Sequence, residues 1–317
     1  MKVFALNASR SGAAAAARRL GAGLGEHEER EFEDGEFKVR PLESVRGERV
    51  FVWHSLYGGG EGGSAADKLC RLLFFVGALK DAGAAEAVCV APYLAFARKD
   101  RRTKPRDPVT TRYVALLFEA VGCDALVTVD VHNVAAFENA FRCPTLNLEA
   151  GPLLAAHYAA DARAANRVVV LAPDAGAVKR ARAFASVLQS ESARPVELAF
   201  AEKSRSEGRV SGERFAGDVD GALVIVVDDL VSGGTTLARA AAAAKERGAA
   251  AVHAAITHGF FATGAAEALS RAELGSIAVT DTIGDVHARG AALGDRLAVV
   301  ETAALIADAL RRLDVGR

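Results

Sequence analysis

The sequence predicts an α/β protein in which parallel β-sheets are covered by helices. Short apolar runs with β-branched residues alternate with Ala-rich helical stretches, which is typical of parallel sheets buried on both faces. The chain has 317 residues, 51% of them hydrophobic, which suits one large or two ordinary domains. Residues 88–101 and 169–182 both run through a strand, Ala-Pro, a small turn and a basic segment. This similarity suggests an internal duplication, with chance as the alternative in a chain so rich in Ala and Val.

The hydrophobic pattern predicts the individual strands and helices along the chain. Apolar runs of strand length predict strands at residues 2–6, 49–54, 87–91, 125–129, 167–172, 222–227 and 251–257. Helical periodicity predicts helices at 65–81, 110–121, 152–160, 178–188 and 235–247, the last ended by Gly248 as a C-cap glycine. Residues 201–221 are polar, charged and Gly-rich, so we expect a long irregular loop there. Turn residues near 145–155 separate a domain of residues 1–147 from one of residues 148–299, and a helix at 300–315 can pack on the first.

Charge and cysteine content narrow the classes of function. Lys and Arg number 39 against 40 Asp and Glu, so the net charge indicates no nucleic-acid or membrane surface. The four cysteines show no Cys-x-x-Cys spacing, which indicates reduced core thiols rather than a disulfide or zinc framework. No segment approaches the roughly 18 apolar residues of a membrane span, and signal-peptide features are lacking. We therefore expect a cytoplasmic protein without nucleic-acid or membrane partners.

The segment VVDDLVSGGTT, residues 226–236, carries the clearest chemical signal. In an open parallel sheet, ligands bind at the carboxyl ends of strands, where a turn leads into a helix N-terminus. Glycines and hydroxyls in such a turn can direct donors at a phosphate. The two carboxylates would repel that phosphate, so they must face a neutral or cationic group, and vicinal sugar hydroxyls suit them. The predicted sugar-phosphate site consists of Asp228, Asp229, Ser232, Gly233, Gly234, Thr235 and Thr236. The alternative is a strand end followed by an ordinary turn.

This segment resembles the phosphoribosyl diphosphate motif of type I phosphoribosyltransferases. Five further segments stand in the order found in ribose-phosphate diphosphokinases: FEDGEFKVR (32–40), ARKDRR (97–102), TVDVHN (128–133), APDAGAVKRARAFA (172–185) and EKSR (202–205). The resemblance to this family implies two tandem type I phosphoribosyltransferase-like domains, each a parallel sheet flanked by helices. It also implies transfer of a diphosphoryl group from ATP to the 1-hydroxyl of ribose 5-phosphate, giving 5-phosphoribosyl 1-diphosphate and AMP for nucleotide biosynthesis.

The resemblance further implies an ATP site. Phe32, Asp34 and Glu36 are expected to bind adenine across a subunit boundary in a homo-oligomer, since a ring with two acceptors suits a purine amine. An ordinary hairpin turn is the alternative for this segment. The triphosphate is expected to bind a cluster of charged residues, because guanidinium groups bind phosphate oxygens in pairs. That cluster consists of Arg98, Lys99, Asp100 and Arg101, with a solvated charge run as the alternative.

Metal and catalytic residues are implied in the same way. His132 and Asp174 are expected to contact the ATP phosphates or their Mg²⁺ ion, which prefers one or two carboxylates with phosphate oxygens and water. Lys203 and Arg205 are expected to be catalytic together with His132, by neutralising charge as AMP departs. Exposed basic loop residues are usually only solvated, so the assignment of Lys203 and Arg205 depends mainly on the resemblance.

The sequence also departs from the family pattern. In SGGTT at 232–236, hydroxyl and glycine residues have exchanged places; Lys99 stands where glutamine is common, and Arg71 where an acid is common. Two other functions stay open. A phosphoribosyltransferase would share the segment at 226–236 but would need neither FEDGE nor RKDRR. A non-catalytic regulatory paralogue would bind nucleotide and assemble with an active synthetase.

Overall fold

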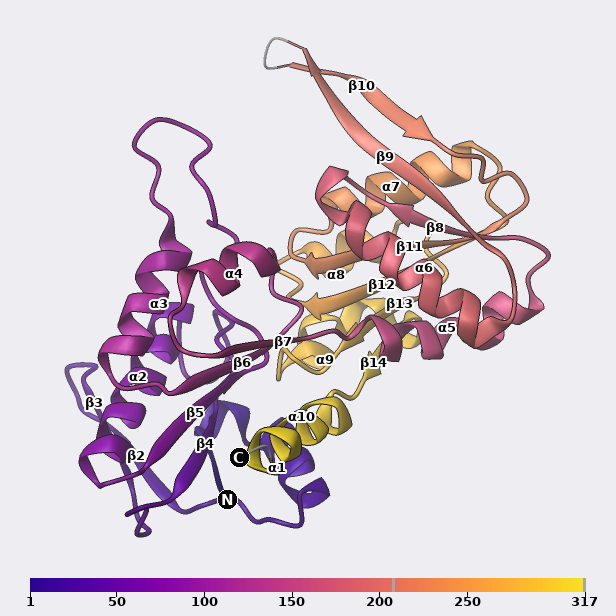
Figure 1. Ribbon diagram of the computed structural model, residues 1–317. Coiled ribbons are helices and arrows are strands. Elements are labelled where there is room, and N and C mark those ends of the chain that lie inside the picture. The colour runs from indigo at the N-terminus through magenta and orange to yellow at the C-terminus, as the bar shows by residue number, and fades with distance from the viewer. Residues whose placement is uncertain (207–208, 316–317) are drawn as a thin grey trace. The chain divides into compact units, whose positions relative to one another are not determined.

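The computed structural model describes residues 1–206 and 209–315, with the backbone alone described at 202–206, 209–214 and 315. Helices and strands alternate along much of the chain (Figure 1), which divides into two compact units. Unit 1 comprises Met1–Leu148, Thr282–Gly284 and Thr302–Arg317, and unit 2 comprises Glu149–Asp281 and Asp285–Glu301. The predicted α/β class is confirmed. The predicted domain limits stay a prediction, because a compact unit is defined by its contacts and not by independent folding.

A five-stranded parallel sheet forms the centre of unit 1, in the order β1-β4-β5-β6-β7. Its strands are β1 (Lys2–Ala5), β4 (Arg49–Trp53), β5 (Glu86–Ala91), β6 (Ala125–Val129) and β7 (Thr145–Leu148). The helices of the unit are η1 (Asn7–Ser9), α1 (Arg10–Arg19), α2 (Ala65–Asp81), α3 (Thr110–Ala120), α4 (Val134–Ala140) and α10 (Ala303–Val315). The central strands are buried along almost their whole length, which explains why they are apolar without alternation.

Unit 2 contains a seven-stranded sheet in the order β10-β9-β8-β11-β12-β13-β14. Only the edge pair β9–β10 is antiparallel among its described pairs. The strands are β8 (Val168–Ala172), β9 (Val196–Ser206), β10 (Arg209–Ala216), β11 (Leu223–Val231), β12 (Ala251–Gly259), β13 (Ile277–Thr280) and β14 (Leu297–Val300). The helices are α5 (Gly151–Ala164), η2 (Ala175–Ala177), α6 (Val178–Ser192), α7 (Thr235–Glu246), α8 (Ala265–Ser270), α9 (Val286–Arg289) and η3 (Ala291–Arg296).

A separate antiparallel hairpin, β2 (His27–Glu31) with β3 (Phe37–Pro41), belongs to unit 1. Its turn contains Gly35 at a φ of 87°, a conformation that glycine adopts without steric cost. Asp34 Oδ1 accepts a hydrogen bond from the Glu36 amide at 3.0 Å, as turn aspartates commonly do. The hairpin turn weighed for Asp34 and Gly35 is therefore present.

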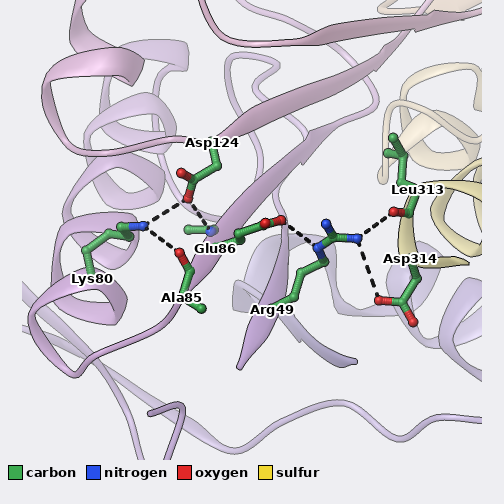
Figure 2. Close-up of polar contacts among 8 residues, drawn as sticks. Arg49, Lys80, Ala85, Glu86, Asp124, Leu313 and Asp314 are labelled. Atoms are coloured by element: carbon green, nitrogen blue, oxygen red, sulfur yellow. Dashed lines mark hydrogen bonds and ion pairs between the residues drawn. The ribbon is translucent and has the colours of Figure 1, made fainter. Parts of the chain in front are cut away.

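The C-terminal helix α10 is joined to the sheet of unit 1 by polar contacts (Figure 2). Arg49 on β4 pairs with Glu86 on β5 at 2.6 Å, donates to the Leu313 carbonyl and lies 3.9 Å from Asp314. Beside it, Lys80 binds Asp124 at 3.0 Å and the Ala85 carbonyl at 3.1 Å. Arg49 thus holds the last helix through a backbone carbonyl and a carboxylate of its final turn. A cation is favourable at this end because it faces the negative end of the helix dipole.

Several predicted elements differ from the structure: α5 and α6 end at Ala164 and Ser192 instead of 160 and 188, and two further differences lie close to the twin aspartates. Most of the region at 201–221, predicted as an irregular loop, lies in β9 and β10, which pair as an antiparallel ribbon. Such a ribbon is stabilised by ladder hydrogen bonds, so its strands need no apolar alternation and the sequence gives little signal. Strand β11 also continues to Val231 instead of ending at 227. The twin aspartates are therefore part of the strand and not of the turn after it.

The expected lack of a membrane-spanning helix and the expected burial of the cysteines concern the helices and thiols of the structure. Within the described residues, no helix combines the length and apolar character needed to cross a bilayer. All four cysteines are free, and Cys89 and Cys123 are buried as predicted. Cys70 is exposed and Cys143 is partly exposed, so the prediction of core thiols is wrong for Cys70.

Candidate functional site

The twin carboxylates lie near the carboxyl end of the central strand β11. Asp229 is buried and Asp228 is partly buried. Successive side chains of a regular strand point to opposite faces, yet both carboxylates reach one guanidinium on α6: Arg180 Nη1 lies 4.0 Å from Asp228 Oδ1 and 3.7 Å from Asp229 Oδ1. In addition, the Asp229 amide donates to Asp228 Oδ1 at 2.9 Å. The structure therefore brings the two acids together.

Negative charge is concentrated around Asp228. Burial, and after it the charge of Asp229, raises the pKa of Asp228 to about 8, with a smaller contribution from Asp174. The distances to Arg180 exceed the usual hydrogen-bond range of about 2.7–3.2 Å, so this cation offsets the repulsion only in part. Hydroxyl donors or a further cation would favour the ionised form of the pair. In the structure the group that faces both acids is a protein cation, Arg180, so the predicted contact with sugar hydroxyls stays a prediction.

The turn after β11 leads directly into α7. Gly234 is the N-cap of α7 and has a φ of 76°, a left-handed conformation that side chains with a Cβ rarely adopt. A Cβ at Gly234 would lie 2.9 Å from Leu269 Cγ, whereas a Cβ at Gly233 would meet no atom within 4 Å. The backbone at Gly234 is thus closely packed, and Gly233 borders open space.

The N-terminus of α7 has donors available for an anion. No side chain caps this helix, although the first N–H groups of a helix have no partner within the helix. Thr235 is exposed, Ser232 and Thr236 are partly exposed, and Gly233 is exposed. Uncapped N–H groups, hydroxyls and the positive end of a helix dipole are groups that can attract an anion. Phosphate binding by the segment Ser232–Thr236 stays a prediction.

Asp174 follows β8, the strand that neighbours β11. Its Oδ1 accepts from the amides of Gly176 at 2.8 Å and Ala177 at 3.1 Å, which caps η2. These bonds fix an exposed carboxylate, and it is near enough to influence the pKa of Asp228. Among the side chains that the structure describes, no group of three metal-ligating residues is arranged to hold an ion. One fixed carboxylate still fits Mg²⁺, which takes most of its other ligands from phosphate and water.

In unit 1, the basic cluster follows β5. Lys99 Nζ binds Asp107 Oδ2 at 2.6 Å, and the same oxygen accepts from the amide and hydroxyl of Thr103 at 3.0 and 2.8 Å. These bonds lower the pKa of Asp107, chiefly through Lys99, and they close the loop into a turn. Lys99 is thus partly neutralised within the protein, while Arg98 and Arg101 are exposed.

His132 lies beyond the end of β6 and is exposed. The next residue, Asn133, donates to Asp100 Oδ2 at 2.6 Å, so the structure brings the segment of His132 beside the basic cluster. Asp130 has a φ of 40°, which is uncommon for residues other than glycine and often marks functional sites. Because Mg²⁺ prefers oxygen ligands, the chemistry of an imidazole suits a phosphate contact better than a magnesium contact.

The remaining predicted residues lie on the two hairpins. Phe32 is 41% exposed, and Asp34 and Glu36 are exposed with it near the β2–β3 turn. Their exposure leaves the ring and both acids accessible to a partner molecule. Lys203 and Arg205 belong to β9, where their backbones pair with Glu213 and Val210 of β10. Their side chains lie outside the described part of the chain.

Sequence reasoning missed three residues that contact the predicted ones: Arg180, Asn133 and Asp107. Arg180 lies in the first turn of α6, within the basic segment after APDAG, and that segment is the signal that could have pointed to it. Asn133 and Asp107 carry no periodic signal, because their partners come from the folding of loops.

Comparisons by family profile, by sequence and by structure all match this chain to the same group of proteins. The profile of the N-terminal domain of ribose phosphate pyrophosphokinase matches residues 1–122, and that of the phosphoribosyl synthetase-associated domain matches residues 209–316. A ribose-phosphate pyrophosphokinase of Caldanaerobacter subterraneus subsp. tengcongensis is 36% identical over all of this chain and 95% of its own length. Ribose-phosphate pyrophosphokinase 1 of Streptococcus pyogenes is 34% identical over the same shares. The crystal structure of phosphoribosylpyrophosphate synthetase from Mycobacterium smegmatis superposes with a TM-score of 0.90 at 30% identity, covering 100% of this chain and 99% of that one.

Proposed function

Because this chain belongs to the ribose-phosphate pyrophosphokinase family, we propose that it transfers the diphosphoryl group of ATP to ribose 5-phosphate. The products are 5-phosphoribosyl 1-diphosphate and AMP, which serve nucleotide biosynthesis. The observation that carries this proposal is the order of groups at the end of β11. Two converging acids stand directly before an uncapped helix N-terminus, and a sugar phosphate satisfies both halves.

Asp228 and Asp229 accept hydrogen bonds from ribose hydroxyls in this proposal. Donors of the segment Ser232–Thr236 hold the 5-phosphate at the start of α7. Gly233 borders open space, so a phosphate oxygen can approach its backbone closely. The sugar is thereby held at both ends, which fixes the direction of its 1-hydroxyl and removes much of the entropic cost of reaction.

Arg98, Arg101 and Lys99 bind the triphosphate of ATP, with Asp100 fixing the loop through Asn133. Of the three cations, Lys99 contributes least because Asp107 already neutralises part of its charge. Phe32, Asp34 and Glu36 bind adenine from a neighbouring subunit of a homo-oligomer; their exposure in the single chain supports this role.

The reaction is an in-line displacement at phosphorus. The 1-hydroxyl of ribose attacks the β-phosphorus of ATP and loses its proton to solvent water. The bond from that phosphorus to the bridging oxygen breaks, and AMP leaves with this oxygen. Lys203, Arg205 and His132 neutralise the charge that develops on the transferred group and on AMP. Asp174 would hold Mg²⁺, which supplies charge neutralisation on the diphosphoryl oxygens when bound. We further propose a cytoplasmic location and division into the domains 1–147 and 148–299.

The test is an assay of products. Purified protein is incubated with ATP, Mg²⁺ and ribose 5-phosphate, and nucleotides are separated by anion-exchange chromatography. We expect AMP to appear in step with 5-phosphoribosyl 1-diphosphate. ADP as the product would indicate an ordinary kinase, and no product would favour a non-catalytic paralogue. Omitting ribose 5-phosphate controls for hydrolysis of ATP.

A further inference from the structure

Arg71 of α2 joins this helix to the β2–β3 hairpin. Its side chain is almost buried, at 8% exposure for the residue. Nη2 lies 3.3 Å from Glu31 Oε1, and Nη1 lies 4.0 Å from Glu29 Oε2. Glu29 and Glu31 both belong to β2, and Glu31 directly precedes Phe32. The guanidinium therefore contacts the strand at the point where it enters the turn.

The same side chain also contacts the second strand of the hairpin. The guanidinium carbon of Arg71 lies 4.4 Å from the centre of the Phe37 ring, the first residue of β3. Phe37 in turn packs on Phe74 of α2, with 5.4 Å between the ring centres. A cation over an aromatic face is attracted by the ring quadrupole, more strongly where water is excluded. One buried cation thus holds the ends of both strands.

Glu29 provides a charged partner that is itself fixed. It accepts from the Asn7 amide at 2.5 Å and lies 2.9 Å from His27 Nε2. Burial opposes its ionisation, but the bonds from His27 and Asn7 dominate together and lower its pKa. Glu29 is therefore ionised near neutral pH and holds its orientation opposite Arg71.

An isolated two-stranded hairpin is marginally stable in water, so its position depends on what it packs against. The turn residues Phe32, Asp34 and Glu36 are exposed, and the contacts given for them lie within the hairpin. We propose that Arg71 is the positioning residue that fixes this hairpin for ATP binding, an inference that rests on the adenine role given to the hairpin above. Replacing Arg71 should therefore weaken ATP binding through the position of the hairpin, because Arg71 itself does not contact ATP in this proposal.

Direct binding and amide exchange test this inference. The variants are Arg71→Gln, Arg71→Lys and Glu31→Gln. Glu31→Gln removes the ion pair with Arg71 by changing its exposed partner. Arg40→Gln is the matched control, because exposed Arg40 pairs with Glu28 at 2.5 Å on the same hairpin, away from the turn. The probe is α,β-methylene ATP, whose affinity is measured by calorimetry, and hydrogen exchange is followed over residues 27–41.

We expect Arg71→Gln to weaken binding of the probe about tenfold and Glu31→Gln about threefold, within the range for partly buried charged contacts. Both should speed amide exchange in the hairpin. Arg71→Lys should recover part of the affinity, since it keeps the charge but loses the planar contact with Phe37. Arg40→Gln should leave affinity for the probe unchanged.

Three results would overturn the inference. Unchanged exchange in both Arg71→Gln and Glu31→Gln would show that the pair does not hold the hairpin. Faster exchange with unchanged affinity would show that the hairpin position does not matter for ATP. Equal loss of affinity in Arg40→Gln would indicate a general effect on the hairpin. Since the probe needs no turnover, AMP formation by the unmodified protein remains a separate test of the proposed function.

Discussion

Arg180 Nη1 lies 3.7 Å from Asp229 Oδ1 and 4.0 Å from Asp228 Oδ1, so a single cation of α6 faces both acids of β11. Neither distance is that of a direct hydrogen bond. The guanidinium therefore moderates the repulsion between the two carboxylates. Its position beside both acids can orient them for the sugar, although burial and the charge of Asp229 still raise the pKa of Asp228 to about 8.

Replacing Arg180 should weaken sugar binding. We expect Arg180→Gln to raise KM for ribose 5-phosphate about tenfold, equivalent to about 1.4 kcal/mol, and to change KM for ATP much less. Steady-state kinetics with each substrate varied in turn measures both. Arg182→Gln, on the exposed side of the same helix, is the control. A similar rise in both KM values would contradict a role specific to the sugar.

The two adjacent glycines of the phosphate turn should respond differently to alanine. Gly234→Ala should destabilise the fold by about 2–4 kcal/mol, because it combines a left-handed backbone with a clash against Leu269. Gly233→Ala meets open space, so it should leave the free energy of unfolding nearly unchanged. If a phosphate occupies that space, Gly233→Ala should still raise KM for ribose 5-phosphate. Urea unfolding and kinetics check the pair; an unaltered KM in Gly233→Ala would argue against the cradle.

The raised pKa of Asp228, about 8, predicts a pH dependence of stability. Below the unfolded pKa, near 4, the carboxyl is neutral in both states, and its contribution to stability is fully present. As pH rises toward 8 the unfolded chain ionises first, so stability falls by up to about 1.4 kcal/mol per pH unit. Asp228→Asn removes this effect and should be more stable than the unmodified protein by about 2 kcal/mol or more at pH 9. Urea unfolding at pH 5, 7 and 9 measures the difference, and a difference independent of pH would contradict the prediction.

The ion pair between Lys99 and Asp107, 2.6 Å long, predicts unequal roles within the basic cluster. Lys99→Ala should raise KM for ATP less than about threefold, whereas Arg101→Ala should raise it about tenfold or more, as expected for a guanidinium that binds phosphate. Initial rates over a range of ATP concentrations compare the two variants. Circular dichroism of both variants checks that the fold is kept when the loop closed by Asp107 loses its contact with Lys99. A larger effect of Lys99→Ala would show that Lys99 exchanges Asp107 for ATP.

Lys203 tests the role given to the β9–β10 hairpin. If its charge acts on the transition state, Lys203→Ala should lower kcat at least about a hundredfold with little change in either KM. Rapid-quench measurement of AMP in a single turnover separates the chemical step from product release. Unchanged turnover would remove Lys203 from the mechanism.

Regular, buried elements were predictable because their signal is local. Helix α2 begins and ends where its periodicity predicts, at Ala65 and Asp81, and β6 spans the predicted residues Ala125–Val129. The ribbon β9–β10 was not predictable from apolar alternation, because its strands pair at a sheet edge through backbone groups. The four-residue strands β7, β13 and β14 were not predicted, whereas β1, of the same length, was predicted from its apolar run.

The sequence by itself determined the fold class, the order of the motifs and the succession of acids, glycines and hydroxyls along β11 and α7. Each of these depends on residues that are close together in the sequence, so the sequence alone is enough to predict it. Only the tertiary structure decided that Arg180 faces both aspartates, that Asp107 neutralises Lys99 and that Arg71 holds the hairpin. Such pairs depend on how helices, strands and loops pack, and packing brings together side chains whose separation in sequence carries no period.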